Sequence, residues 1–97
     1  MIERIMLFKL HDPATRSEVA RLTQSALRTL PELEALSVGL PADAAAERSW
    51  DLSVVIGSTS MTALSALLTS APFVHYLEQT MKDRYVVLKA WNFERQG

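Results

Sequence analysis

Apolar and polar residues alternate along four segments of the chain, and this pattern predicts four β-strands. Alternation puts every second side chain on the same face of a sheet, so a period of two indicates a strand. The clearest case has Leu52, Val54 and Ile56 on one face. Gly39, at the end of the second segment, predicts a bend or bulge there. The predicted strands are Ile2–Leu10, Leu36–Leu40, Trp50–Ser58 and Arg84–Phe93.

Two helical regions are predicted between these strands, because apolar residues recur there every three or four positions. Asp12 and Pro13 resemble an N-cap and a first-turn proline, and Thr15 with Glu18 has the spacing of a capping box. Pro31 is expected to end this first helix. The apolar stripe of the first helix consists of Val19, Leu22, Ala26 and Leu30. The second helical region is interrupted at Thr69–Pro72, and its apolar stripe consists of Met61, Leu64, Leu67, Leu68, Val74, Leu77 and Met81.

The order of elements is strand, helix, strand, strand, broken helix, strand. This βαββαβ order is typical of the ferredoxin-like arrangement, an α+β fold with a four-stranded antiparallel sheet and helices on one face. A chain of 97 residues is the length of one domain, so we expect a single domain over residues 1–97.

The face of the sheet away from the helices is predicted to be apolar as well. Ile5 and Leu7 in the first strand, and Val87 and Trp91 in the last, alternate with other apolar residues. A solvated face is normally polar, and a contiguous apolar patch marks an interface. We therefore expect a two-fold homodimer with the sheets face to face. The alternative is that the chain covers the patch itself, but the only long connection, Pro41–Ser49, is Ala-rich and lacks bulk.

Composition and charge exclude several classes of partner. The net charge is −1, the isoelectric point is about 6.1, and the basic residues are scattered, so no nucleic-acid partner is expected. No apolar run has the length of a membrane span, which predicts no membrane partner. The chain has no cysteine, which excludes disulfide and thiol chemistry. We expect a cytoplasmic protein.

Five segments together resemble the Dabb family of stress-responsive, dimeric α/β-barrel domains. They are "IERIMLFKL", "LEALSVG", "WDLSVVIGS", "SAPFVHYL" and "DRYVVLKAW", which cover nearly the whole chain in the family's order. The resemblance implies a ferredoxin-like protomer whose sheet forms a barrel with that of a second copy. This agrees with the interface expected from alternation.

The family includes a plant polyketide cyclase that works by acid–base catalysis without a cofactor. The resemblance places its catalytic histidine of the first strand at Arg4 and its tyrosine at Leu68. Its "HPxH" turn reads Ala71–Val74 here, so both histidines are replaced. These changes argue against the cyclase reaction in this protein and weigh against catalysis, although whether it is an enzyme stays open.

Two polar residues remain as weak catalytic candidates. His75 lies one position beyond the turn, which rotates it about 100° on a helix, so it is either a general base at the rim of the helix–sheet crevice or an exposed residue. Arg4 either meets an anionic ligand in that crevice or extends to the surface. We expect a ligand to contact Arg4, Phe8, Leu68, Val74 and His75.

No pattern of residues indicates a metal or cofactor. The second histidine, His11, lies in a turn far from His75 and from any dense carboxylate cluster. Three functions therefore remain: a dimer that binds a small apolar or aromatic molecule, a cofactor-free enzyme of cyclase, isomerase or small monooxygenase type using Arg4 and His75, and a purely structural role. The first is the one we expect.

Overall fold

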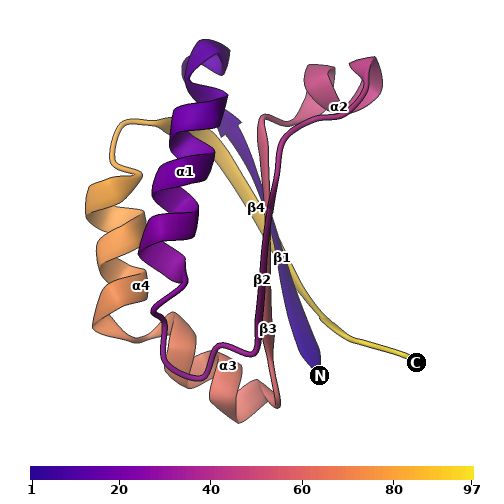
Figure 1. The fold of residues 1–97 in the computed structure, drawn as a ribbon, viewed down its shortest axis with the longest axis vertical. Coiled ribbons are helices and arrows are strands. Elements are labelled where there is room, and N and C mark those ends of the chain that lie inside the picture. The colour runs from indigo at the N-terminus through magenta and orange to yellow at the C-terminus, as the bar shows by residue number, and fades with distance from the viewer.

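The fold is a four-stranded antiparallel sheet with helices packed on one face (Figure 1). A computed structural model describes all residues, 1–97. The strand order β2-β3-β1-β4 confirms the ferredoxin-like βαββαβ fold. The strands are β1 Ile2–Leu10, β2 Ala35–Gly39, β3 Leu52–Ser58 and β4 Tyr85–Glu94.

The helical layer consists of α1, α3 and α4, and α2 projects from the other side of the sheet (Figure 1). A 3₁₀ turn precedes α1, and α4 continues into a π-helical turn, η2. The helices are α1 Arg16–Leu27, α2 Ala44–Ser49, α3 Met61–Leu68 and α4 Ala71–His75, and the two turns are η1 Pro13–Thr15 and η2 Tyr76–Thr80.

The start of the first helix differs in detail from the prediction. Asp12 does cap, because its Oδ1 accepts from the backbone N–H of Ala14 at 3.0 Å, and Pro13 opens the 3₁₀ turn. The predicted capping box of Thr15 and Glu18 does not form. The Thr15 hydroxyl instead donates to the carbonyl of Asp12 at 2.7 Å, and no side chain caps α1. The helix also ends at Leu27, several residues before the proline.

The core lies between the helical layer and the inner face of the sheet. The predicted stripe of the last helix is confirmed at Met81, which is buried, and Leu77 is half-buried. It is wrong at Val74, which is exposed while Phe73 and Tyr76 are buried. The π-helical turn sets this phase: Met81 donates its N–H to the carbonyl of Tyr76 at 2.8 Å, five residues back. The fully enclosed side chains are Met6, Phe8, Val19, Thr23, Leu27, Leu52, Val54, Ile56, Leu64, Leu67, Tyr76 and Met81.

A bulge at the start of β4 changes which of its residues face the helices. The register with β1 shifts between Lys9 and Leu10, so Tyr85 pairs with Leu10. The Tyr85 ring then packs edge-on against Phe8, with ring centroids 5.3 Å apart. Strict alternation with Val87, which was predicted on the open face, would put Val86 on the inner face, but Val86 is 52% exposed. A strict period of two cannot predict a bulge, because a bulge adds a residue to one strand only.

The stretch expected to be a plain connection contains α2. Asp43 caps it, accepting from the N–H of Ala46 at 2.8 Å. The expectation of a bend or bulge at Gly39 is also wrong, because this residue pairs regularly with Ser53. A Cβ atom on Gly39 would lie 2.6 Å from Ser53 Oγ, so close packing of the two strands explains the glycine.

Candidate functional site

The structure distributes the five predicted ligand-binding residues between the core and the surface. Phe8 is fully buried, and Arg4 and Leu68 are half-buried. Val74 and His75 are exposed on α4. The ring of Phe8 meets Tyr76 edge-on at 6.5 Å, so side chains fill the crevice at its centre.

Arg4 lies on the inner face, toward one end of the sheet. Its Nη1 donates to Asn92 Oδ1 at 3.0 Å, while its Nε is buried without a hydrogen-bond partner. Burial lowers the pKa of Arg4 from its ordinary value, because the charged form loses solvation. A buried donor without an acceptor is costly, so Arg4 retains an unused capacity to bind an anion or a carbonyl.

His75 has no orienting partner. Its side chain is exposed and forms no hydrogen bond or ion pair. No polar contact joins His75 to Arg4, which lies on β1 and bonds to Asn92 instead. General acid–base catalysis needs a positioned group, and the structure does not bring these two residues together as such a pair.

Sequence reasoning missed a buried hydroxyl pair. Tyr76 and Thr23 are both fully buried, and their hydroxyl oxygens lie 2.8 Å apart. Burial raises the pKa of Tyr76 to about 12, although the Thr23 hydrogen bond opposes this. The pair ties η2 to α1 and keeps the phenol neutral and away from solvent. The helical period could have indicated it, because Thr23 lies one position beyond the predicted Leu22.

A buried carboxylate was also missed. Asp51, 1% exposed, accepts from the N–H of Leu10 at 2.7 Å and from Arg16 Nε at 2.8 Å. Arg16 also reaches Glu47 at 3.4 Å, and the hydrogen bond with Asp51 raises its pKa. The cluster fastens the start of α1 to the end of β1 and to α2. The only sequence signal was a charged residue, Asp51, at the second position of the predicted strand Trp50–Ser58.

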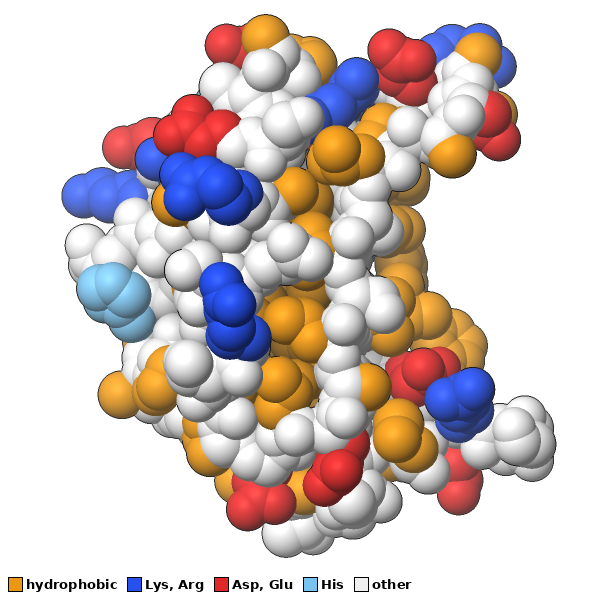
Figure 2. Space-filling model, in the orientation of Figure 1, with side chains coloured by type: hydrophobic (Ala, Val, Ile, Leu, Met, Phe, Trp, Pro, Cys, Tyr) orange, Lys and Arg blue, Asp and Glu red, His pale blue; other side chains and the backbone are white.

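The largest hollow is a groove of about 330 Å³ between α1 and the edge strand β2. It is lined by Gln24, Arg28 and Leu36. Figure 2 shows apolar side chains along the gap between these two elements. The groove therefore opens toward the apolar layer between helices and sheet.

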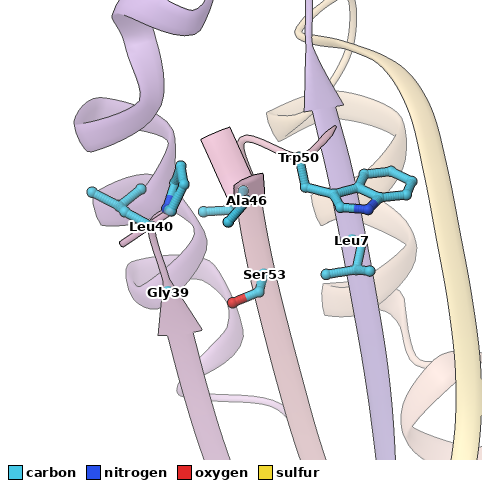
Figure 3. A pocket seen from close by; sticks show the side chains of 8 residues that line it. Leu7, Gly39, Leu40, Ala46, Trp50 and Ser53 are labelled. Carbon is cyan, nitrogen blue, oxygen red and sulfur yellow. The ribbon is translucent and has the colours of Figure 1, made fainter. Parts of the chain in front are cut away.

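A smaller hollow, about 120 Å³, lies on the opposite, open face of the sheet. It forms over Gly39 and Ser53, two small residues that pair across β2 and β3. Figure 3 shows Leu40, Ala46 and Trp50 around it. Leu7 also borders the hollow, so α2 and Trp50 cover part of one predicted interface residue.

The four predicted interface residues all lie on the open face. Antiparallel pairing puts Ile5 directly beside Trp91, and Leu7 and Val87 lie on the same side. Trp91 is 49% exposed, and the next outward residue of β4, Phe93, is 55% exposed. The patch thus runs from the middle of the sheet to its β4 edge.

The structure contains no group of His, Asp and Glu side chains arranged to hold a metal ion. None of its helices combines the length and the apolar character that crossing a membrane requires.

Comparisons with known proteins identify the fold. No protein-family profile and no curated protein sequence matches the chain. Among solved structures, it is similar to a Dabb family protein with a ferredoxin-like fold from Mesorhizobium loti, with a TM-score of 0.80 at 8% identity over 99% of this chain and 97% of that one.

Two further structures extend the comparison. A dimeric protein of unknown function and ferredoxin-like fold from Bacteroides fragilis has a TM-score of 0.79 at 17% identity, covering 97% of this chain and 95% of that one. SnoaB, a cofactor-independent oxygenase from Streptomyces nogalater, has a TM-score of 0.72 at 12% identity, covering 99% and 93%. At these identities the likeness shows the fold and not the activity. The chain has the ferredoxin-like fold found in the Dabb family, as the five sequence segments indicated.

Proposed function

We propose that this protein is a homodimer whose protomers each bind a small apolar or aromatic molecule between the helices and the sheet. The observation that carries the proposal is the groove of about 330 Å³ beside α1 and β2. Ligand pockets are usually about 300–1,000 Å³, mostly apolar, with a few polar groups that orient the ligand. The volume of the groove is at the lower end of this range, which favours a small ligand. Its mouth is mainly polar, because Gln24 and Arg28 line it beside Leu36, so the apolar part of the ligand would lie against Leu36 and the apolar layer beneath it.

The register of the sheet connects the groove to Arg4. Leu36, Ile56 and Arg4 are neighbours in one row across the inner face, in that order from the β2 edge. A ligand that entered over Leu36 and displaced the side chains above Ile56 would find apolar walls and then the unpartnered Arg4 Nε. The preferred ligand therefore has an apolar body and one polar or anionic end.

The homodimer is supported by the apolar open face and by the similar structure from Bacteroides fragilis, which is a dimeric protein. Burying each large side chain of this face contributes about 1.5–3 kcal/mol. Exposed apolar patches of this kind mark protein interfaces.

We propose binding without catalysis, because His75 lacks an orienting partner. The similar structure SnoaB is a cofactor-independent oxygenase. The alternative to be tested is therefore that this protein is also an enzyme. Finding a ligand whose reactive atom contacts both Arg4 and His75 would favour the enzyme.

Native mass spectrometry of freshly purified protein tests both parts of the proposal. We expect twice 10.8 kDa, plus a small bound molecule on each protomer. A monomer would contradict the dimer. If the ligand is lost during purification, titration with the fluorescent anion anilinonaphthalene sulfonate replaces this readout.

A matched pair of variants locates the site. Leu36→Trp fills the groove and is expected to weaken binding of the fluorescent probe at least about tenfold, which corresponds to about 1.4 kcal/mol. Val86→Trp, on the exposed bulge of β4, should leave binding unchanged. Equal binding by both variants would show that the groove is not the entrance.

A further inference from the structure

The mouth of the groove between α1 and β2 carries two polar side chains from one face of α1. Gln24 and Arg28 line the groove together with Leu36 of β2. The N–H of Arg28, the C-cap residue of α1, donates to the carbonyl of Gln24 at 3.1 Å, so the helical backbone continues from one to the other. Residues four positions apart are neighbours on the surface of a helix. The two side chains therefore border the same opening.

Neither of these side chains has a partner within the protein. The Arg28 guanidinium forms no ion pair, since the only ion pairs join Arg16 to Glu47 and to Asp51. The side chains of Gln24 and Arg28 also take part in no hydrogen bond, and both are exposed. Their hydrogen-bond donors are therefore available to a molecule that enters the groove.

The surroundings of the mouth are basic. Arg21 lies seven residues before Arg28, two turns of α1, and is also exposed. Figure 2 shows basic side chains over α1, beside the apolar gap. Glu32 and Glu34 follow in the connection to β2, but neither forms an ion pair with Arg28. No carboxylate lines the groove, so its walls do not repel an anionic group.

We propose that the groove binds small carboxylic acids with an apolar or aromatic body, and that Arg28 holds the carboxylate at the mouth. The proposal rests on the proposed function and adds the chemical class of the ligand. An arginine guanidinium donates two parallel N–H groups to one carboxylate. The side-chain amide of Gln24, one turn earlier, supplies two more N–H donors. A neutral ligand would leave most of these donors unused.

The carboxylate belongs at the mouth and not at Arg4. Arg4 lies two strands from Leu36 in the same row of the sheet, so their Cα atoms are about 10 Å apart. A carboxylate at the exposed mouth keeps much of its hydration, whereas one that reached the buried Nε of Arg4 would lose it. The apolar body then lies against Leu36, and a carbonyl or hydroxyl group suits the inner end near Arg4.

The alternative role of Arg28 is purely structural. A cation at the C-terminal end of a helix is favourable because of the helix dipole, whether or not a ligand binds. This role predicts that removing the charge lowers the stability of the protein and leaves the choice of ligand unchanged. The ligand preference of an Arg28 variant therefore separates the two roles.

Two compounds of the same shape test the proposal. Naphthalene-2-carboxylate and naphthalene-2-carboxamide share the apolar body and differ in charge at neutral pH. We expect calorimetric titration to show that the carboxylate binds the unaltered protein at least about fivefold more tightly than the amide, because of its charge-assisted hydrogen bonds. Raising the salt concentration from about 0.05 to 0.5 M should weaken binding of the carboxylate and leave that of the amide unchanged.

Three variants locate the carboxylate. Arg28→Gln should abolish the preference for the carboxylate. The matched control is Arg48→Gln, which removes the same charge from an exposed residue of α2, on the other side of the sheet, and should keep the preference (Figure 1). Arg4→Met reports the competing location. Loss of the preference in this variant, and not in Arg28→Gln, would put the carboxylate at the inner end and overturn the proposal.

The remaining outcomes separate this proposal from the proposed function. Equal affinity for the two compounds, with both weakened by Leu36→Trp, would overturn the preference for acids and leave the groove as the ligand site. So would binding of the fluorescent probe without binding of either naphthalene compound. If neither the compounds nor the probe bind, the proposed function fails and this proposal fails with it.

Discussion

The two faces of this sheet carry similar amounts of apolar side chain but differ in what covers them. On the inner face, Met6, Phe8 and Val54 are completely covered by the helical layer. On the open face, Ile5 is half-buried and Trp91 is 49% exposed. Apolar alternation therefore predicts a sheet that is apolar on both faces without predicting what covers each one: helices of the same chain bury the inner face, and we propose that a second copy buries the open face.

Substitutions on the two faces are therefore detected by different experiments. Changes on the inner face should alter the stability of the protomer at any protein concentration. Changes on the open face should alter association and depend on concentration.

Phe8→Ala should have the largest effect. The side chain is fully buried and contacts both Tyr76 and Tyr85. Such a truncation costs about 3–5 kcal/mol through lost burial and the remaining cavity. Urea unfolding at several protein concentrations should show the same loss at each. A loss that disappears at high concentration would assign Phe8 to the interface instead.

Trp91→Ala should act on the dimer alone. A buried aromatic residue at the centre of an interface contributes about 2 kcal/mol or more, which raises the dissociation constant about 30-fold or more. Sedimentation equilibrium measures this directly. Met61→Ala, at a similarly exposed apolar residue on α3 in the helical layer, is the control that should change nothing. If both variants associate equally well, the open face is not the interface.

High pH should destabilise the core of the protomer through ionisation of Tyr76, which lies on η2. Below about pH 10 the phenol is neutral in the folded and unfolded states. Between pH 10 and its folded pKa of about 12, only the unfolded chain loses the proton, so stability falls as pH rises. The loss at pH 12 is about 2–3 kcal/mol.

Comparing the protein with Tyr76→Phe isolates this effect, because other groups titrate equally in both. The variant should begin about 1–3 kcal/mol less stable, since the Thr23 hydroxyl is left without its partner. It should then show a smaller decline between pH 10 and 12 in urea unfolding. Identical declines would mean that Tyr76 is accessible to solvent.

Asp43→Ala should give the smallest effect, because it removes only the N-cap of the six-residue helix α2. Loss of such a cap costs about 1 kcal/mol. We expect faster amide hydrogen exchange confined to α2, which borders the open face but not the core. Faster exchange throughout the inner face would show that α2 supports the whole fold.

Much of this architecture could be predicted from the alternation pattern. The first strand, Ile2–Leu10, has the predicted bounds, and Ile5, Leu7, Val87 and Trp91 lie on the open face as expected. Strict alternation failed where the backbone departs from a regular period. The bulge moved Tyr85 inward and Val86 outward, and the π-helical turn replaced Val74 with Phe73 and Tyr76 in the core.

The candidate site was less predictable than the fold. Alternation along β1 alone predicts that Arg4 lies on the inner face. Its hydrogen bond to Asn92 could not be predicted in this way, because it depends on the register between β1 and β4, which are distant in sequence. The groove beside Leu36 depends on how far α1 extends over β2, which no local pattern encodes. The Asp51–Arg16 pair likewise joins a helix start to a strand start 35 residues away.

The central position of β1 has a consequence for how the chain is made. This first strand lies between β3 and β4, and its Ile2 pairs with Glu94. Contacts this distant in sequence form slowly, because a long loop must close first. A nascent chain on the ribosome therefore holds an incomplete sheet until its last strand emerges. Arg95 already donates its N–H to the carbonyl of Met1 at 2.9 Å, so a circular permutant joined at the two ends turns this pairing into a hairpin. Its refolding, followed by stopped-flow fluorescence, should be faster than that of the natural order.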